Sequence, residues 1–195
     1  MKKIITLFLI VFFQSSSISA DTSKKVKRII IGNKDAKINI IAYESLTCSH
    51  CASFHMDVLP NLKRDYIDTG LAKIEFRHFP LDIAAFNASK IAQCKNDGNS
   101  DVLNSLYLNQ SKWVKGKTID EINQNLKNFL FSEGITIDFN KCITDKKIED
   151  FVLNDRIEGV KKFKVNATPT IIINDKKFEK SLNYKNLKKT LEKLI

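Results

Sequence analysis

The sequence has 195 residues and a formal net charge of +10 at pH 7. All but four of its 32 Lys and Arg residues are lysines, and they are spread along the whole chain. Because a nucleic-acid-binding surface favours arginine, a concentrated basic stripe and interleaved aromatic side chains, we expect no nucleic acid among the partners. The charge instead favours contact with anionic lipid or acidic partners.

Residues 1–20 have the pattern of a secretory signal peptide. Lys2 and Lys3 precede the apolar block Ile4 to Phe13, and the chain then becomes polar and small up to Ala20. A membrane anchor is the alternative reading, but this ten-residue block is about half as long as the roughly 20 apolar residues that span a bilayer. We therefore expect export, with cleavage near Ala20.

The remaining region, residues 21–195, has a length that fits one domain with an insertion. Residues 21–28 are expected to be disordered. Residues 38–43 (INIIAY) are mostly apolar and predict a largely buried first strand. This strand ends just before Cys48 and Cys51, which places both cysteines at a strand-to-helix turn.

A helix and a second strand are predicted to follow the cysteines. Apolar residues recur at helical spacing from Cys51 to Ile67, with Pro60 predicting a kink and Gly70 a C-cap. In residues 71–79, apolar and polar residues then alternate, which predicts a second strand. The predicted unit is βαβ, with the cysteines at the start of its crossover helix.

Helical periodicity continues from about residue 83 to residue 163, and Thr118 to Glu121 has the form of a capping box. Residues 170–178 then predict a β-hairpin, and residues 182–195 predict a closing amphipathic helix. A βα half, a helical block and a ββα half together predict an α/β protein. We expect a thioredoxin fold with an inserted all-helical domain at about residues 83–163.

The spacing of Cys48 and Cys51 favours redox chemistry. A cysteine in the first turn of a helix faces unpaired backbone N–H groups and the positive end of the helix dipole, which stabilise a thiolate. We therefore predict that Cys48 is the nucleophile and that Cys51, one turn later and facing inward, is the resolving thiol. His50 lies between them and is predicted to donate a hydrogen bond or a charge to the Cys48 thiolate.

Two other interpretations of this stretch remain open. Cys48, Cys51 and His55 have the spacing C-x2-C-x3-H, but a structural zinc site needs four ligands, and Cys94 and Cys142 are isolated in the sequence. A copper-binding envelope protein is the most sensible form of the metal hypothesis, although we predict no metal. A purely structural disulfide would constrain the unfolded chain little, because the loop is so small. His55 is expected to be a surface or packed histidine.

Several motifs together resemble the DsbA-like thiol:disulfide oxidoreductases of the bacterial envelope, within the thioredoxin superfamily. They are Thr47 to Cys51 (TCSHC), Val58 to Pro60 (VLP), Phe76 to Asp82 (FRHFPLD) and Val165 to Thr170 (VNATPT). The resemblance covers about residues 38–195 and implies the same architecture as the periodicity. It also implies a periplasmic location and no cofactor.

The resemblance assigns roles to further residues. It implies that the Thr168–Pro169 bond is cis, that Pro169 lies against the cysteine pair, and that Thr168 offers its backbone to an extended substrate. Family members often carry an acid at the position of Ala42, and Glu44, on the same face of the strand, is a candidate to replace it as a proton relay for Cys51.

This sequence also departs from the family pattern. Ser49-His50 stands where the best-known oxidases have Pro-His, and Thr168 stands where the strongest oxidases often have valine. Threonine at that position is also familiar from disulfide isomerases. The departures leave the direction of the exchange open.

Cys94 and Cys142 are the remaining cysteines. In an oxidising compartment we expect them to form a second, non-catalytic disulfide. The alternative is two buried free thiols that pack as small apolar residues.

The leading functional hypothesis is a periplasmic oxidase that donates the Cys48–Cys51 disulfide to exported proteins with reduced cysteines. A DsbB-like membrane quinone reductase would reoxidise it. A reductase or isomerase of the same fold is the close alternative, and a copper-binding envelope protein is the alternative from another class. We expect a monomer, because isomerases of this superfamily usually carry an N-terminal dimerisation segment and few residues precede the predicted first strand.

Overall fold

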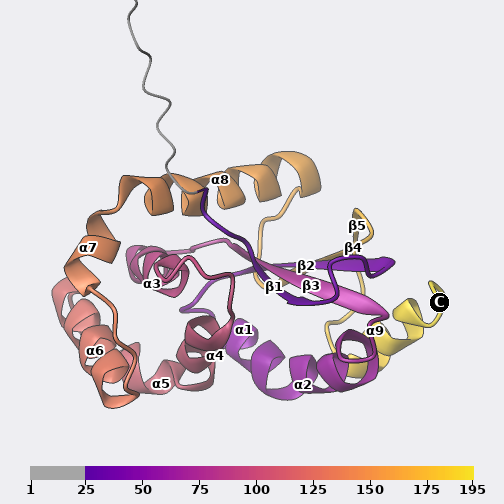
Figure 1. The fold of residues 1–195 in the computed structure, drawn as a ribbon, viewed down its shortest axis with the longest axis horizontal. Coiled ribbons are helices and arrows are strands. Elements are labelled where there is room, and N and C mark those ends of the chain that lie inside the picture. The colour runs from indigo at the N-terminus through magenta and orange to yellow at the C-terminus, as the bar shows by residue number, and fades with distance from the viewer. Residues whose placement is uncertain (1–24) are drawn as a thin grey trace, which may run out of the picture.

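The computed structural model describes residues 25–195, so the predicted signal peptide lies outside the described residues. A five-stranded sheet with the order β1-β3-β2-β4-β5 forms the centre (Figure 1). β2 and β3 are parallel, and the other neighbouring strands are antiparallel. The strands are β1 (Ile29–Gly32), β2 (Ile38–Glu44), β3 (Ala72–His78), β4 (Thr170–Ile173) and β5 (Lys176–Lys177).

The helices fall into three groups along the chain. Between β2 and β3 lie α1 (Ser49–Ser53), η1 (Phe54–Val58), α2 (Leu59–Leu62) and η2 (Lys63–Ile67). Between β3 and β4 lie α3 (Ile83–Gln93), α4 (Asp101–Leu108), α5 (Gln110–Trp113), α6 (Ile119–Ser132), α7 (Phe139–Thr144) and α8 (Lys146–Phe163). α9 (Tyr184–Leu191) follows the hairpin. The predicted α/β class, with a thioredoxin fold interrupted by a helical block, is confirmed.

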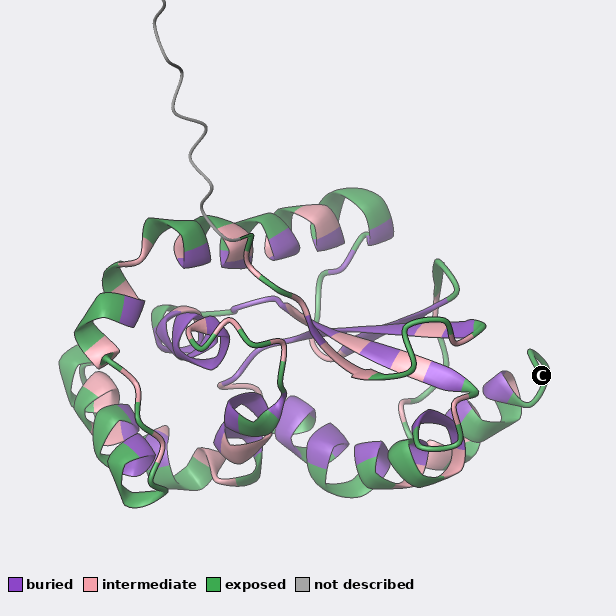
Figure 2. Ribbon diagram, in the orientation of Figure 1, coloured by how far each residue is buried: buried purple, intermediate pink, exposed green. Residues whose placement is uncertain are grey.

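The sheet is covered on both faces, as Figures 1 and 2 show: α8 crosses one face, and α1, α2 and α9 lie against the other. Successive side chains of β2 point to opposite faces of the sheet and so contribute to the cores on its two sides. Ile40 and Ala42 join the large core that continues into the helical insert. Ile41 and Tyr43 join a smaller core with Phe163 of α8.

Gly159 lets α8 approach the sheet closely. A Cβ atom at this position would lie 2.8 Å from Cε1 of Tyr43, a distance that real side chains do not tolerate. The absence of a side chain therefore helps to set the distance between the helix and β2.

The helix that follows the cysteines contains two π turns. At the first of them the backbone N–H of Leu59 donates to the carbonyl of Phe54, five residues earlier. Pro60, where the sequence predicts a kink, has no backbone N–H to donate, and the helix widens into a π turn just before it. The run as a whole ends at Asp68, just before Gly70.

One strand was missed, and part of the predicted disorder is wrong. β1 pairs with β3, so the strand at Ile38 is not the first, and the residue count that supported a monomer used the wrong strand. Lys27 donates its backbone N–H to Asn96 (2.6 Å), and Arg28 forms an ion pair with the fully buried Asp155. The strand was missed because its sequence, Ile-Ile-Ile-Gly, does not alternate between apolar and polar residues. The order of Lys27 and Arg28 was missed because Asn96 and Asp155 lie far away in the sequence.

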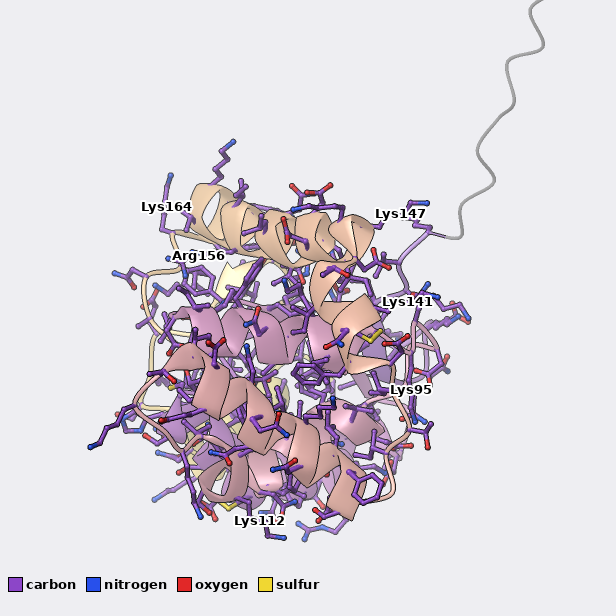
Figure 3. The ribbon with its side chains drawn as sticks, turned by 90° about the vertical axis from the view of Figure 1, so that its left-hand side faces the viewer. Lys95, Lys112, Lys141, Lys147, Arg156 and Lys164 are labelled. Atoms are coloured by element: carbon purple, nitrogen blue, oxygen red, sulfur yellow. A yellow bond between two sulfur atoms is a disulfide. The ribbon has the colours of Figure 1, made fainter. Side chains whose placement is uncertain are left out.

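The insert presents its basic residues over a wide face. Figure 3 shows Lys95, Lys112, Lys141, Lys147, Arg156 and Lys164 at separate places on this face, not in one stripe. Between residues 25 and 195, no helix combines the length and apolarity that a membrane span requires.

Candidate functional site

Cys48 lies at the start of α1, immediately after the turn that follows β2. It is the N-cap residue of α1, and its carbonyl accepts hydrogen bonds from the backbone N–H groups of Cys51 (3.1 Å) and Ala52 (3.2 Å). Cys48 is partly exposed, whereas Cys51 is fully buried. Both are free thiols. The local geometry therefore offers one sulfur to a partner and keeps the other inside.

The surroundings separate the acidities of the two thiols. The pKa of Cys48 is lowered to about 5, mainly because the Cys51 thiol donates a hydrogen bond to its sulfur. The Thr168 side chain and the backbone N–H groups of Cys51 and His50 add to this effect, against the opposing effect of burial. Burial is the main reason why the pKa of Cys51 is raised, and Cys48 and Glu44 raise it further. Cys48 is thus prepared to ionise and Cys51 to hold a proton.

His50 has an exposed side chain that lines a groove beside Cys48. The contribution of this residue to the lowered pKa of Cys48 comes from its backbone N–H. A direct effect of the imidazole ring on the thiolate stays a prediction.

The Thr168–Pro169 peptide bond is cis, and this segment lies against Cys48. The Cys48 thiol donates to the carbonyl oxygen of Thr168 (Sγ to O, 3.4 Å). The Thr168 hydroxyl is buried and has no hydrogen-bond partner among the described residues, so it is free to donate to the sulfur once Cys48 is ionised.

Thr168 and Pro169 also form one wall of the groove beside Cys48. The groove has a volume of about 430 Å³. Its lining is His50, Ser53, Phe54, Asp57, Val58, Thr168, Pro169, Leu182 and Asn183. An extended peptide chain with a reactive sulfur would have access to Cys48 from this side.

Glu44 ends β2 and is buried, together with His55. Its Oε2 lies 2.9 Å from Nε2 of His55, whose Nδ1 lies 3.1 Å from Oδ1 of Asn104 on α4. The pKa of Glu44 is raised because burial disfavours its charge, although His55 acts in the opposite direction. His55 is therefore a packed histidine with both ring nitrogens engaged by protein groups.

These engaged nitrogens matter for the metal hypothesis. Within residues 25–195, no group of three or more His, Cys, Asp or Glu side chains is arranged to hold a metal ion. His55 points at Glu44 and Asn104, as their distances show.

A clamp from the helical insert was not anticipated. The side-chain amide of Gln110 donates to the carbonyls of Leu46 (2.8 Å) and Cys48 (3.1 Å). The hydroxyl of Thr47 donates to Asp82 (2.6 Å), the N-cap residue of α3. These bonds fix the turn that carries Cys48. Only the motif residues Thr47 and Asp82 gave a sequence signal; Gln110 gave none.

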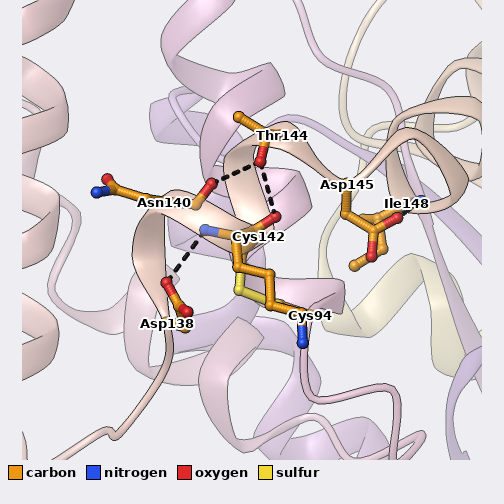
Figure 4. The surroundings of a disulfide bond; sticks show 8 residues. Cys94, Asp138, Asn140, Cys142, Thr144, Asp145 and Ile148 are labelled. Atoms are coloured by element: carbon orange, nitrogen blue, oxygen red, sulfur yellow. Dashed lines mark hydrogen bonds between the residues drawn. A yellow bond between two sulfur atoms is a disulfide. The ribbon is translucent and has the colours of Figure 1, made fainter.

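The second cysteine pair lies in the insert and is oxidised. Cys94, just after α3, forms a disulfide with Cys142 of α7 across 48 positions of sequence (Figure 4). Cys142 is buried, and its backbone N–H donates to the carbonyl of Asp138 (3.0 Å). The disulfide links the end of α3 to α7, two helices of the insert.

Comparison with known proteins gives a consistent result. Residues 24–193 match the family model described as Thioredoxin. A protein of Rickettsia bellii named "Putative protein-disulfide oxidoreductase" is 32% identical over 149 residues, which are 75% of this chain and 56% of that protein. Disulfide bond formation protein D of Bacillus subtilis is 24% identical, over 84% of this chain and 75% of that protein. The chain thus spans little more than half the length of its Rickettsia relative.

Solved structures are similar over most of the chain. The crystal structure of alpha-DsbA1 from Wolbachia pipientis is 31% identical, with a TM-score of 0.75, and covers 86% of this chain and 90% of its own. BdbD from Bacillus subtilis is 22% identical, with a TM-score of 0.70 over 86% of this chain and 92% of its own, and shows the shared fold.

Proposed function

Since the chain belongs to the thioredoxin family and, within it, to the DsbA-like thiol:disulfide oxidoreductases, we propose that it oxidises exported proteins by thiol–disulfide exchange through Cys48 and Cys51. We further propose that residues 1–20 direct export, that residues 21–195 work in the periplasm as a monomer, and that a DsbB-like quinone reductase reoxidises the pair.

One observation supports this proposal above the others: the two thiols have opposite environments. Cys48 is partly exposed with a pKa lowered to about 5, and Cys51 is buried with a raised pKa. A thiolate that is stable in the reduced protein favours the reduced state, so the disulfide gives up its oxidising equivalents readily.

The proposed exchange has two steps. A substrate thiolate attacks the Cys48 sulfur of the disulfide, and Cys51 leaves and takes up a proton. A second substrate thiolate then attacks the substrate sulfur of the mixed disulfide, and Cys48 leaves as a thiolate. The substrate gains one disulfide, and the protein is left with two thiols.

Thr168 and Pro169 are proposed to hold the substrate backbone, and Glu44 to serve the proton transfers of Cys51. The groove beside His50 is where the substrate chain would lie.

The equilibrium of Cys48–Cys51 with glutathione tests the direction of exchange. We expect a potential more oxidising than the roughly −270 mV of thioredoxin. A potential at or below that value would favour the reductase hypothesis. Stoichiometric metal in the purified reduced protein would favour the copper-binding hypothesis.

A further inference from the structure

Three polar side chains from different elements meet where β2 ends, shortly before the cysteines. Glu44 comes from β2, His55 from η1 and Asn104 from α4. Glu44 and His55 are each only 3% exposed, and 2.9 Å separates Oε2 of Glu44 from Nε2 of His55. A hydrogen-bonded cluster of this kind is costly to bury, and its carboxyl group acts electrostatically on Cys51.

The hydrogen bonds determine where the protons are. The Asn104 amide donates its N–H to Ser100 (3.2 Å), so its oxygen faces His55 and can only accept. Nδ1 of His55 therefore carries a hydrogen. Nε2 then either lacks a hydrogen, in which case Glu44 is protonated and donates to it, or bears one, in which case Glu44 is a carboxylate.

Both arrangements place one proton between Glu44 and His55. Without that proton, a carboxylate oxygen and a nitrogen lone pair would face each other at 2.9 Å with no hydrogen between them. The two residues therefore share one proton and are neutral as a pair. The other carboxyl oxygen, Oε1 of Glu44, is buried and has no partner among the residues that the structure describes.

The side chains around Glu44 and His55 include few other groups that could take up or release the shared proton. Cys48, the N-cap residue of α1, and Cys51 within α1 interact electrostatically with Glu44. The Tyr107 ring of α4 stacks on His55 at 4.1 Å, and its pKa is raised well above the usual value by burial. The neighbouring Phe54 and Phe76 rings cannot titrate. His78, paired with Glu44 in the strand register, directs its ring at Gln93.

We propose that Glu44 and His55 form a single acid–base unit that delivers a proton to the Cys51 sulfur when it leaves the disulfide, and that Asn104 sets the protonation of His55. The proposal rests on the proposed exchange function. Glu44 is the donor to the reacting sulfur, and His55 and Asn104 are positioning residues that act through it.

A substrate thiolate forms a bond to the Cys48 sulfur while the bond between the Cys48 and Cys51 sulfurs breaks, and the electron pair of that bond remains on Cys51. The shared proton moves from Glu44 to the Cys51 sulfur, which becomes a neutral thiol. The pair, now negatively charged, regains a proton from solvent.

The environment of Cys51 explains why a proton donor is needed. Its pKa is raised mainly by burial and further by Cys48, so a bare Cys51 thiolate is a poor leaving group. A donor that becomes charged only after it has released its proton lowers this barrier.

The test measures, against pH, the rate constant with which the disulfide form oxidises a synthetic dithiol peptide. Because the peptide titrates identically with every protein, the ratio of parent to variant isolates the proton-donating unit. Over the range from about pH 4 to pH 9, Glu44→Gln should remove one step from the parent profile, with a loss of at least about tenfold where the unit is protonated.

The two positioning residues should move that step in opposite directions. His55→Phe removes a group that lowers the pKa of Glu44, so the step should move to higher pH. Asn104→Leu lets His55 place its hydrogen on Nε2 and stabilise the carboxylate, so the step should move to lower pH. A purely structural role would not give opposite shifts.

Asp155→Asn is the matched control, because it also neutralises a buried carboxyl, on α8 and bound to Arg28. It should leave the step where the parent has it. Should Glu44→Gln keep the parent step, or should His55→Phe and Asn104→Leu fail to shift it in opposite directions, the proposal is overturned.

A second measurement needs no variant and therefore does not depend on variants that fold. The ¹⁵N chemical shifts of the His55 ring in the parent protein should show a protonated Nδ1, and an unprotonated Nδ1 would overturn the proposal. A parent that exchanges no disulfide at all would instead contradict the proposed function, so the two failures are distinguishable.

Discussion

The protein carries two cysteine pairs that differ in their spacing along the chain and in their oxidation state. Cys48 and Cys51 are free thiols one helical turn apart at the start of α1. Cys94 and Cys142 form a disulfide that joins α3 to α7, with 48 positions between them. Each pair has one partly exposed and one buried cysteine, so exposure does not distinguish them.

The difference shows that position, not residue type, decides what a cysteine does. At Cys48, hydrogen-bond donors converge on the sulfur and favour the thiolate. Cys94 and Cys142 instead close a long loop, which removes conformations from the unfolded chain. One pair is proposed to work by changing its oxidation state, and the other by keeping it.

The largest change should follow Cys48→Ser. This variant loses the only sulfur that we propose to react with substrate, so oxidation of a dithiol peptide should fall to the uncatalysed rate. The matched variant Cys94→Ser should retain the activity of its folded fraction. Peptide oxidation measured per folded molecule checks this, and substantial turnover by Cys48→Ser would show that another pair does the chemistry.

Cys51→Ser should also stop turnover, but by a different route. Without Cys51 the protein cannot form the disulfide that substrate thiolates attack, but the Cys48 thiolate can still attack a disulfide of another protein, and no thiol inside the protein then resolves the mixed disulfide. Mixed disulfides should therefore accumulate, and non-reducing electrophoresis with mass spectrometry would detect them. If no trapped substrate is found, the roles assigned to the two thiols are wrong.

Removal of the second disulfide by Cys94→Ala together with Cys142→Ala should affect stability and not chemistry. For a loop of this length, we expect the free energy of unfolding to fall by about 2–4 kcal/mol. Denaturant titration of the parent and the double variant gives the value, and peptide oxidation gives the activity. A stable but inactive double variant would place this pair in the mechanism.

His50→Leu should have the smallest effect, because Cys51, Thr168 and backbone N–H groups already lower the pKa of Cys48. If the ring also stabilises the thiolate, its loss should raise the pKa of Cys48 and make the potential more reducing. The two shifts should be coupled, at up to roughly 30 mV for each 1.4 kcal/mol. Thiolate absorbance against pH and the glutathione equilibrium test this coupling, and an unchanged pKa and potential would leave the ring without a role.

The features that the sequence predicted are those encoded by neighbouring residues. Two cysteines at one-turn spacing after an apolar strand identify a helix N-terminus, and Thr168 and Pro169 were identified by their motif. The period of two along the strand also placed Glu44 on the same face as Ala42, and both side chains are buried in the structure.

The features that were missed depend on contacts between distant parts of the chain. Gln110 reaches the turn of Cys48 from the insert, and Asn104 reaches His55 from a separate helix. β1 exists because β3 offers it a partner, since its four residues alone carry no strand periodicity. Local patterns contain no information about such pairings.

The titration of Cys48 tests the central claim most directly. In the reduced parent protein, thiolate absorbance and the rate of alkylation should both rise through one step, which the structure places at a pKa of about 5. The disulfide form has no such thiolate, so the Cys48 thiolate stabilises only the reduced form. This stabilisation should be lost as pH falls through the pKa of Cys48. A Cys48 that titrates near the roughly 8.5 of an ordinary cysteine would contradict the account.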